Sequence, residues 1–299
     1  MAYRHPDRIS FYHPYNFLLQ PSRAAELYLN EINQSIENNN AKCISDSEGN
    51  SLTYELLRWD TEFFGRPIYK VHCLQLTPRT NDQQIDALFN NLCSSINQTN
   101  PKAYVFFEIP SEDLDSLQSV SRSGWMMIEN RLTYFNHNIA MLDSQVQDQV
   151  RLANQNDVED LKSTAVFSRN YFDRFHSDPY FSEDEVDRFM GVFIENSLNG
   201  REDYVVVPQT GPANAFFAGS KVQVDEDLSI GRMTLSAVSP ERKGWHICVT
   251  QGLCAYFQQV AIDTAVMTTQ STNRAVLTNL WKLNFKFGKA SHVFSKLSS

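Results

Sequence analysis

Two cations stand immediately before a predicted helix in the second half of the chain. Arg242 and Lys243 follow an apolar stretch and a Ser-Pro break, and Gly244 then opens the helix. A strand that feeds a helix through a cationic turn gathers free backbone N–H groups at the positive end of the helix dipole. This arrangement suits a pyrophosphate. The competing interpretation is that Trp245 and His246 only cap the helix and pack.

A second group of charged and aromatic side chains lies upstream, in residues 169–180. Cations, rings and hydrogen-bonding groups alternate there, and a phosphorylated ligand with a ring system needs all three kinds. His176 has an ordinary pKa near neutrality, so it could take a proton from an amine. A surface helix with an apolar stripe and ordinary charges is the alternative. The candidate ligand-binding residues are Arg169, Tyr171, Arg174, His176 and Tyr180.

The overall composition limits which partners these groups can serve. The 299 residues carry a formal net charge of −9 and contain no long basic block. A broad electrostatic footprint for nucleic acid is therefore not expected, whereas a local concentration of cations can still bind an anion. Hydrophobic residues make up 42% of the chain, enough for one large core or two smaller ones.

The N-terminus and the cysteines indicate a cytoplasmic protein. No apolar run approaches the length of a membrane span, and the first residues lack the apolar core of a signal peptide, so no membrane partner is expected. The cysteines are odd in number and scattered, which predicts reduced, mostly buried thiols with neither a disulfide framework nor a metal site. They are Cys43, Cys73, Cys93, Cys248 and Cys254.

Two stretches of the chain share one order of predicted elements: strand, helix, strand, helix, strand. Apolar runs of strand length alternate with segments of helical periodicity in both stretches. A Thr-Pro break in the first corresponds to the Ser-Pro break in the second, which favours an internal duplication. The predicted elements are 67–76, 81–96, 103–109, 112–122 and 125–135, then 229–238, 244–259, 261–268, 273–283 and 285–294.

This order predicts an α/β protein of two βαβαβ halves around mixed sheets. We expect an N-terminal extension over 1–58 with one helix, a first half over 59–149, and a second half over 150–299. The second half begins with a mainly helical segment, 150–198. The turn at 77–83 contains no glycine and only one cation, so the second half alone is expected to bind phosphate.

The second half resembles the GNAT acyltransferase superfamily in the order and spacing of its motifs. Val238-Ser239-Pro240 resembles the end of the family's cofactor-binding strand, and the turn after it has the frame of the family's [Arg/Gln]-x-x-Gly-x-[Gly/Ala] loop. Lys243 stands at the first position of that loop, His246 at the first glycine and Cys248 at the second. Asn273 and Phe285 lie at the family spacing, while Val276, Leu280 and Asn284 replace its alanine, tyrosine and glycine.

The resemblance implies acyl-CoA as the co-substrate, without a metal. The pantetheine arm would lie along a splayed strand, and the amides after Lys243 would hold the pyrophosphate. Leu280 cannot provide the proton that the family's tyrosine usually provides, so the acid stays unassigned. The residues implied in acyl-CoA binding are Leu235, Ser236, Ala237, Val238, Arg242, Lys243, Gly244, Trp245, His246, Ile247, Cys248 and Asn273.

Two further blocks, residues 57–65 and 173–181, resemble the GNAT enzymes that acylate amino sugars on nucleotide carriers, such as the dTDP-fucosamine N-acetyltransferases. This resemblance implies direct transfer of an acetyl or 3-hydroxybutanoyl group to the amine of a dTDP-linked amino-deoxy sugar. The product would enter surface-polysaccharide synthesis, such as that of a lipopolysaccharide O-antigen. His176 and Asp60 are the candidate catalytic residues, and Asp60 equally fits a helix N-cap or a turn. We expect a monomer or a homodimer.

Two other functions stay open at the level of the sequence. One is a GNAT enzyme that acts on a peptide or a small-molecule amine. The other is a non-catalytic acyl-CoA-binding module, which the missing tyrosine and the substituted glycines favour. The three carboxylates at 225–227 are no better candidates for a base, because solvated charges in a hairpin turn explain them more simply.

Overall fold

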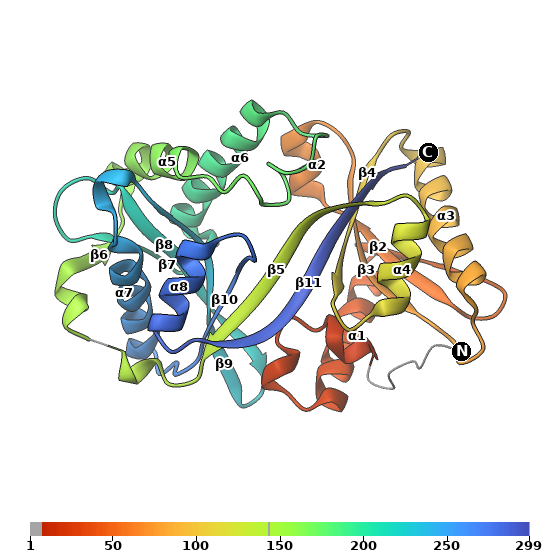
Figure 1. The fold of residues 1–299 in the computed structure, drawn as a ribbon, viewed down its shortest axis with the longest axis horizontal. Coiled ribbons are helices and arrows are strands. Elements are labelled where there is room, and N and C mark those ends of the chain that lie inside the picture. The colour runs from red at the N-terminus through yellow and green to blue at the C-terminus, as the bar shows by residue number, and fades with distance from the viewer. Residues whose placement is uncertain (1–7, 143, 299) are drawn as a thin grey trace. The chain divides into compact units, whose positions relative to one another are not determined.

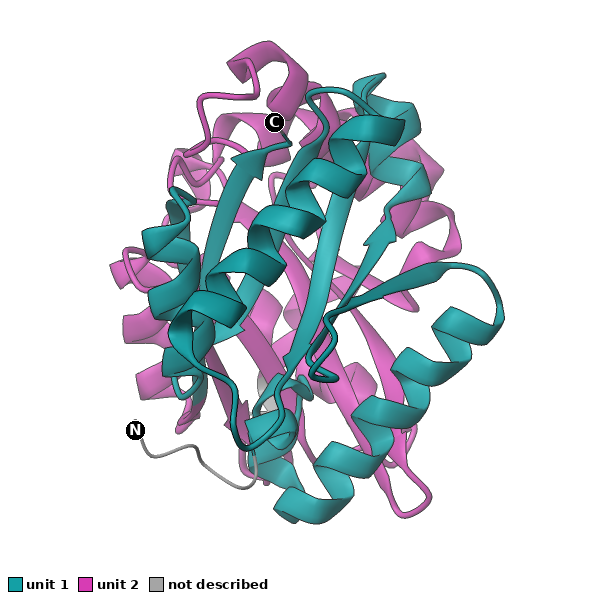
Figure 2. Cartoon of the chain, turned by 90° about the vertical axis from the view of Figure 1, so that its right-hand side faces the viewer, with its two compact units in different colours: residues 1–130, 289–299 teal, residues 131–288 magenta. Residues whose placement is uncertain are grey.

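The computed structural model describes residues 8–142 and 144–298, which fall into two compact units (Figures 1 and 2). Unit 1 comprises residues 1–130 and 289–299, and unit 2 comprises residues 131–288. Strand β5 (Met126–Asn136) leads from unit 1 into unit 2, and strand β11 (Lys286–Leu297) leads back. The end of the chain therefore belongs to the same unit as its beginning.

Unit 1 is built on a mixed sheet. In it β1 (Ala41–Ser45), β2 (Ser51–Leu56) and β3 (Ile68–Gln75) pair antiparallel, β4 (Tyr104–Pro110) runs parallel to β3, and the end of β11 pairs antiparallel with β4. Its helices are α1 (Pro21–Glu37), α2 (Arg58–Phe64), α3 (Asp82–Thr99) and α4 (Leu114–Arg122), and two short turns, η1 (Arg8–Tyr12) and η2 (Asn16–Leu18), precede them.

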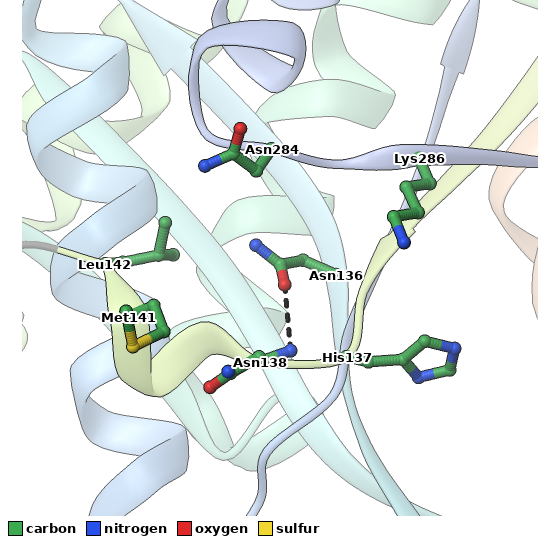
Figure 3. Close-up of a pocket in the computed structure, with 7 residues that line it drawn as sticks. All are labelled: Asn136, His137, Asn138, Met141, Leu142, Asn284 and Lys286. Atoms are coloured by element: carbon green, nitrogen blue, oxygen red, sulfur yellow. Dashed lines mark hydrogen bonds between the residues drawn. The ribbon is translucent and has the colours of Figure 1, made fainter.

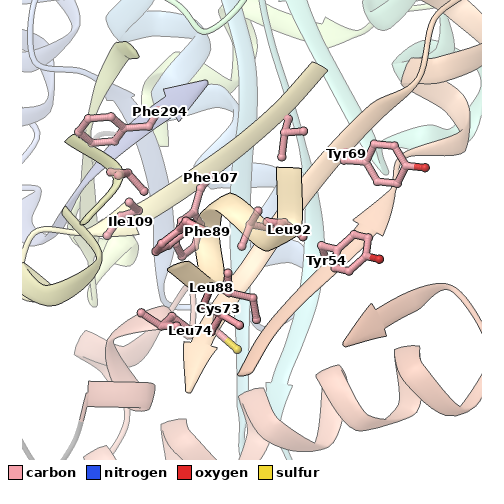
Figure 4. Close-up of a cluster of buried hydrophobic side chains, with 14 of the residues drawn as sticks. Tyr54, Tyr69, Cys73, Leu74, Leu88, Phe89, Leu92, Phe107, Ile109 and Phe294 are labelled. Atoms are coloured by element: carbon pink, nitrogen blue, oxygen red, sulfur yellow. The ribbon is translucent and has the colours of Figure 1, made fainter. Parts of the chain in front are cut away.

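Helix α3 buries one apolar face against the sheet of unit 1. Its buried residues recur at helical spacing and pack among strand residues such as Cys73 and Phe107 (Figure 4). Each fully buried Leu, Ile or Phe side chain contributes about 1.5–3 kcal/mol. The buried face consists of Ile85, Leu88, Phe89, Leu92, Cys93 and Ile96.

Unit 2 contains strands in the order β5-β10-β9-β8-β7-β6, with β9 and β10 parallel to each other. The strands that lie wholly in this unit are β6 (Val150–Leu152), β7 (Tyr204–Pro208), β8 (Ala215–Asp225), β9 (Leu228–Val238) and β10 (Ala265–Gln270). The helices are α5 (Val158–Phe167), α6 (Glu183–Asn196), α7 (Trp245–Gln259) and α8 (Arg274–Lys282). Short turns are η3 (Ile139–Met141), η4 (Ser144–Gln149), η5 (Gln155–Asp157), η6 (Ser197–Arg201) and η7 (Pro240–Arg242).

Unit 2 has a core on each face of its sheet, because successive strand residues point to opposite faces. Phe217 and Met233 pack with α7 and α8 on one face, whereas Phe216 and Ala237 pack with α5 and α6 on the other. Helix α7 lies very close to the sheet. A Cβ atom added at Gly231 would lie 2.2 Å from the Phe257 ring, so this position requires glycine.

The predicted order of elements is confirmed in both halves. The succession β3–α3–β4–α4–β5 repeats as β9–α7–β10–α8–β11. The largest boundary error is at β10, which begins at Ala265 instead of residue 261. There Ala261 adopts φ 59° and the Ile262 amide bonds the Phe257 carbonyl, so these residues close α7 instead of starting a strand.

The predicted domain boundaries differ from the two units. Residues 1–58 are no separate extension, since α1, β1 and β2 belong to unit 1. The end of β11 pairs with β4 across nearly 190 positions of sequence, a pairing that periodicity cannot predict. Strands β1, β2, β6, β7 and β8 were also not predicted. The segment 150–198 is helical only in α5 and α6, because residues 168–182 form a long irregular loop.

Candidate functional site

Strands β9 and β10 of unit 2 separate along their length. In the described register, Gly231, Arg232 and Met233 pair with Ala265, Val266 and Met267, and the pairing goes no further although both strands continue. A bulge in β9 at Thr234 marks the separation, where the Thr234 hydroxyl donates to the Ala218 carbonyl at 3.1 Å. An open strand edge of this kind can pair with an extended ligand that contains amides.

The predicted acyl-CoA-binding residues of β9 lie beyond this bulge. The side chains of Leu235 and Ala237 pack against the α5–α6 core, and Ser236 and Val238 face α7. These side chains are therefore engaged on the two faces of the sheet. In the plane of the sheet, this part of β9 therefore presents its backbone N–H and C=O groups to a ligand.

The loop after α5 connects the far ends of the two separated strands. The Ser168 hydroxyl donates to the carbonyl of Val238 at 2.9 Å, at the end of β9, and the Asn170 side-chain amide donates to the side-chain carbonyl of Gln270, at the end of β10. The gap between the strands is thus bounded by this loop. The sequence contained no signal for Ser168 or Asn170, whose partners lie 70 and 100 positions away.

The turn into α7 is open to an anion. Gly244 adopts φ 95°, no side chain caps the helix, and its first turn contains no acidic residue. The first N–H groups of a helix have no partner within the helix, so those after Gly244 remain available. Helix α3 differs: Asn81 and Gln84 form a capping box, and Asp82 places a carboxylate in the first turn.

The two cations of this turn have different surroundings. The Arg242 guanidinium donates to the Asn214 side chain at 3.0 Å and to the Thr210 carbonyl at 3.1 Å, and it lies 4.7 Å from the centre of the Trp245 ring. Arg242 thus ties the turn to the loop after β7. Lys243 is exposed, and it is the cation of the pair that is better placed to meet a bound anion.

His246 bridges the start of α7 and strand β9. Its Nε2 lies 3.2 Å from the Ser236 hydroxyl and its Nδ1 lies 3.4 Å from the Thr250 hydroxyl. Thr250 donates to the His246 carbonyl, so it can only accept from Nδ1–H, and Nε2 then accepts from Ser236. Burial lowers the pKa of His246 to about 4, and the ring is therefore neutral at physiological pH.

His246 is expected to make unit 2 less stable in acid. The unfolded chain takes up a proton near pH 6.5 and the folded chain only near pH 4, so stability falls as the pH decreases between these values. The loss reaches on the order of 3 kcal/mol. The variant His246→Gln should flatten this part of the pH profile in urea denaturation. An unchanged slope in His246→Gln would contradict this assignment.

Leu280, which stands where the resembled GNAT motif has its proton-donating tyrosine, lies in the core. Leu280 is 0% exposed and packs with Val276 and Phe285, so a group at this position faces apolar side chains. Asn273 caps α8 by accepting from the Val276 amide at 3.3 Å, which occupies its side-chain oxygen. Asn284 adopts φ 57°, the backbone conformation for which the family's motif has glycine.

A pocket of about 320 Å³ lies at the other end of α8 (Figure 3). It opens beside Asn284 and Asn136, where β5 pairs with the first residue of β10. The separated ends of β9 and β10 are at the opposite end of these strands. This pocket is therefore distinct from the gap that the sequence motifs line.

The predicted base His176 is enclosed by carboxylates. Its Nδ1 lies 2.7 Å from Asp173 and its Nε2 lies 3.4 Å from Asp187, and its side chain is 2% exposed. Burial disfavours the imidazolium, but the hydrogen bonds and charges of Asp173 and Asp187 outweigh this effect and raise the pKa of His176. In this conformation the ring holds the loop together, and a substrate amine would have to displace a carboxylate to reach it.

Of the other predicted acceptor residues, Arg169 and Tyr171 line a groove between α5 and α6. Arg169 binds Asp187 and Glu183, and it donates to the Tyr171 hydroxyl at 3.1 Å. Arg169, Tyr171 and Asp187 line this cavity of about 800 Å³, and the Tyr171 side chain is exposed. Arg174 lies over the Phe175 ring at 4.1 Å and Tyr180 packs edge-on against Phe181 at 5.2 Å. The structure thus brings together Arg169 and His176, which share Asp187, and Tyr171, which contacts both of them.

Asp60 belongs to unit 1, in the first turn of the short helix α2. The neighbouring Trp59 and Phe63 rings stack at 5.7 Å, and Gly65 ends the helix with φ 65°, a conformation that glycine adopts without strain. Asp60 is partly exposed.

Two properties of the described residues concern metals and membranes. Across 8–142 and 144–298, no three His, Cys, Asp or Glu side chains gather as a set that could hold a metal ion. In the same residues, every helix is too short or too polar to span a bilayer.

No protein-family profile matches the chain, and no curated protein is significantly similar to it in sequence. Solved structures do share its fold. A GCN5-related N-acetyltransferase from Sphaerobacter thermophilus aligns with a TM-score of 0.59 at 10% identity, covering 97% of this chain and 91% of that one. A tandem GNAT protein from the clavulanic acid biosynthesis pathway aligns with a TM-score of 0.54 at 13% identity, covering 87% and 84%.

A third similar structure is a GCN5-related glucosamine N-acetyltransferase region of a fungal multi-domain β-N-acetylglucosaminidase. It aligns with a TM-score of 0.58 at 12% identity, covering 86% of this chain and 33% of that one. At these identities the shared property is the fold. The chain therefore has the fold of the tandem GCN5-related N-acetyltransferases, the GNAT fold.

Proposed function

We propose that the protein is an acyl-CoA-dependent N-acyltransferase. The observation that carries this proposal is the separation of β9 and β10 after Met233 beside the uncapped start of α7. Residues 234–238 would pair with the amides of the pantetheine arm, and the N–H groups after Gly244, with Lys243, would bind the pyrophosphate. The equivalent turn in unit 1 is closed by Asn81 and Asp82, which supports a single site in unit 2.

The proposed reaction is direct transfer. A neutral amine attacks the thioester carbonyl, a C–N bond forms as the C–S bond breaks, and the departing thiolate takes up a proton. Leu280 is buried, so no acid acts from the family's usual position. Holding the two reactants in line is then the main contribution of the site, a contribution that can be worth several kcal/mol of barrier.

For the acceptor we propose the amine of a dTDP-linked amino-deoxy sugar, whose product would enter surface-polysaccharide synthesis. The resemblance of residues 57–65 and 173–181 to enzymes of this kind supports the proposal. The groove beside Arg169 and Tyr171 offers a cation and an exposed ring, and an amino-sugar acetyltransferase shares the fold. His176 and Asp60 remain the candidate catalytic residues, with His176 acting only if the loop that encloses it rearranges.

The test is release of free thiol from acetyl-CoA or 3-hydroxybutanoyl-CoA in the presence of dTDP-amino sugars. We expect turnover with at least one sugar and none with dTDP alone. Acylation of peptides or simple amines, without turnover of any dTDP-amino sugar, would contradict the acceptor but keep the enzyme. Tight CoA binding without release for any amine would identify a non-catalytic acyl-CoA-binding module, which the buried Leu280 would then explain.

A further inference from the structure

Unit 1 contains the same strand separation as unit 2. Its parallel pair β3 and β4 is joined only from Ile68–Tyr104 to Val71–Phe107, although β3 continues to Gln75. Strand β3 has a bulge at the next residue, His72, just as β9 has one directly after its last paired residue. The duplicated half therefore opens a second gap of the same design.

This second gap is occupied by side chains from the start of the chain. The Tyr28 hydroxyl donates to the His72 carbonyl at 2.9 Å, and the Arg8 guanidinium donates to the Leu74 carbonyl. Carbonyls two residues apart point to the same edge of a strand, here the edge that β4 has left. Both backbone acceptors are thus already bonded.

Tyr12 packs in the core of unit 1 beside the separated strands. Its ring stacks on Phe107 of β4 at 5.9 Å and on Tyr28 at 6.0 Å. Its hydroxyl donates to Asp113, which also binds Arg8 Nε at 2.8 Å and caps α4. The turn η1 accordingly contacts both β3 and β4.

A buried lysine also bonds this segment. Lys289, on β11, donates from Nζ to the Phe11 carbonyl at 2.6 Å and to the His13 carbonyl at 3.2 Å. Burial lowers the pKa of Lys289, while Glu108 and Glu112 oppose that effect. The ammonium is thus directed at two backbone carbonyls of the N-terminal segment, an arrangement that serves to bind it.

We propose that residues 8–13 are an intramolecular ligand of unit 1. They pack against β3 and β4 where these strands separate, and Arg8 bonds the Leu74 carbonyl on the strand edge that, in unit 2, is proposed to receive the pantetheine arm. The comparison of residues 8–13 with a bound pantetheine arm rests on the proposed function. The placement of residues 8–13 in unit 1 rests only on the contacts described above. Unit 1 thus retains the groove between its separated strands, and residues 8–13 of the same chain bind there.

The experiment is peptide exchange in a nicked protein. A protease site is inserted after Leu19, between η2 and α1, and the folded chain is cleaved without CoA present. A labelled peptide of residues 8–19 should enter as the cleaved segment leaves, and native mass spectrometry should show one peptide per chain. The peptide with Arg8→Ala should compete at least tenfold more weakly, whereas Pro14→Ala, a change at an exposed position, should compete like the parent.

Equal competition by all three peptides, or loss of the cleaved segment without exchange, would overturn the proposal. If the nicked protein does not stay folded, the proposal is tested instead by comparing amide hydrogen exchange in the intact Arg8→Gln variant with that in the parent protein. Amides of residues 71–76 should then exchange faster, while those of α7 stay protected. Unchanged protection of 71–76 would also overturn it. Since CoA is absent throughout, failure here is distinct from failure of the proposed enzymatic activity.

Discussion

Replacement of Lys243 by glutamate is expected to weaken CoA binding by about tenfold to a hundredfold. The substitution reverses a charge beside the uncapped N-terminus of α7, where we place the pyrophosphate. Lys243 is exposed, so the fold should tolerate the change and the melting temperature should stay within about 2 °C. Calorimetric titration with CoA measures the affinity directly.

The matched control is Lys221→Glu, which reverses an equally exposed lysine on β8. It should leave CoA affinity within about twofold of the parent, since screening limits the reach of surface charges to about 10 Å at 0.1 M salt. The difference between the two variants should shrink as salt is raised. Equal affinities for both variants at low salt would remove Lys243 and the turn before α7 from the proposed site.

Replacement of Asp113 by asparagine is expected to destabilise unit 1 by about 3–5 kcal/mol. The Asp113 side chain is 1% exposed and pairs with Arg8, whose side chain is 11% exposed. Asparagine retains the volume and the capping oxygen but leaves a buried guanidinium without its carboxylate, the costly way to break a buried ion pair. Tyr12 would also lose its acceptor carboxylate. Urea denaturation measures the change.

Two further variants test whether the loss of stability in Asp113→Asn comes from the unpaired charge of Arg8. The double variant Arg8→Met with Asp113→Asn should lose less stability than the sum of the two single variants, because no unpaired charge remains. Glu26→Gln breaks the exposed pair of Glu26 with Arg23 and should change stability by less than about 1 kcal/mol. A loss below about 1 kcal/mol for Asp113→Asn would mean that water reaches Arg8.

Much of the local structure was predictable because its causes are local. The apolar spacing of α3 and α7, the breaks at Pro78 and Pro240 and the glycine at 244 determine where elements begin and end. These features predicted the duplicated order of strands and helices and the open turn before α7. The carboxylates at 225–227 likewise proved to lie at the β8–β9 hairpin.

The roles of single residues were less predictable. Arg242 and Lys243 are adjacent in sequence, yet Arg242 binds Asn214 and the Thr210 carbonyl while Lys243 is exposed. His176 was expected to be available as a base, and its two carboxylate partners enclose it instead. The residue type determines which chemistry a side chain can perform, whereas the neighbouring residues determine whether a ligand can reach it.

The sequence by itself determined the elements of the two βαβαβ repeats, their order and the chemistry available at the turn before α7. Only the tertiary structure decided where β9 leaves β10, which half keeps an open gap and which half fills it. Those outcomes depend on contacts between distant residues, such as Arg8 with Asp113 and Ser168 with Val238. The partners of each contact lie 105 and 70 positions apart in the sequence, so no local periodicity encodes it.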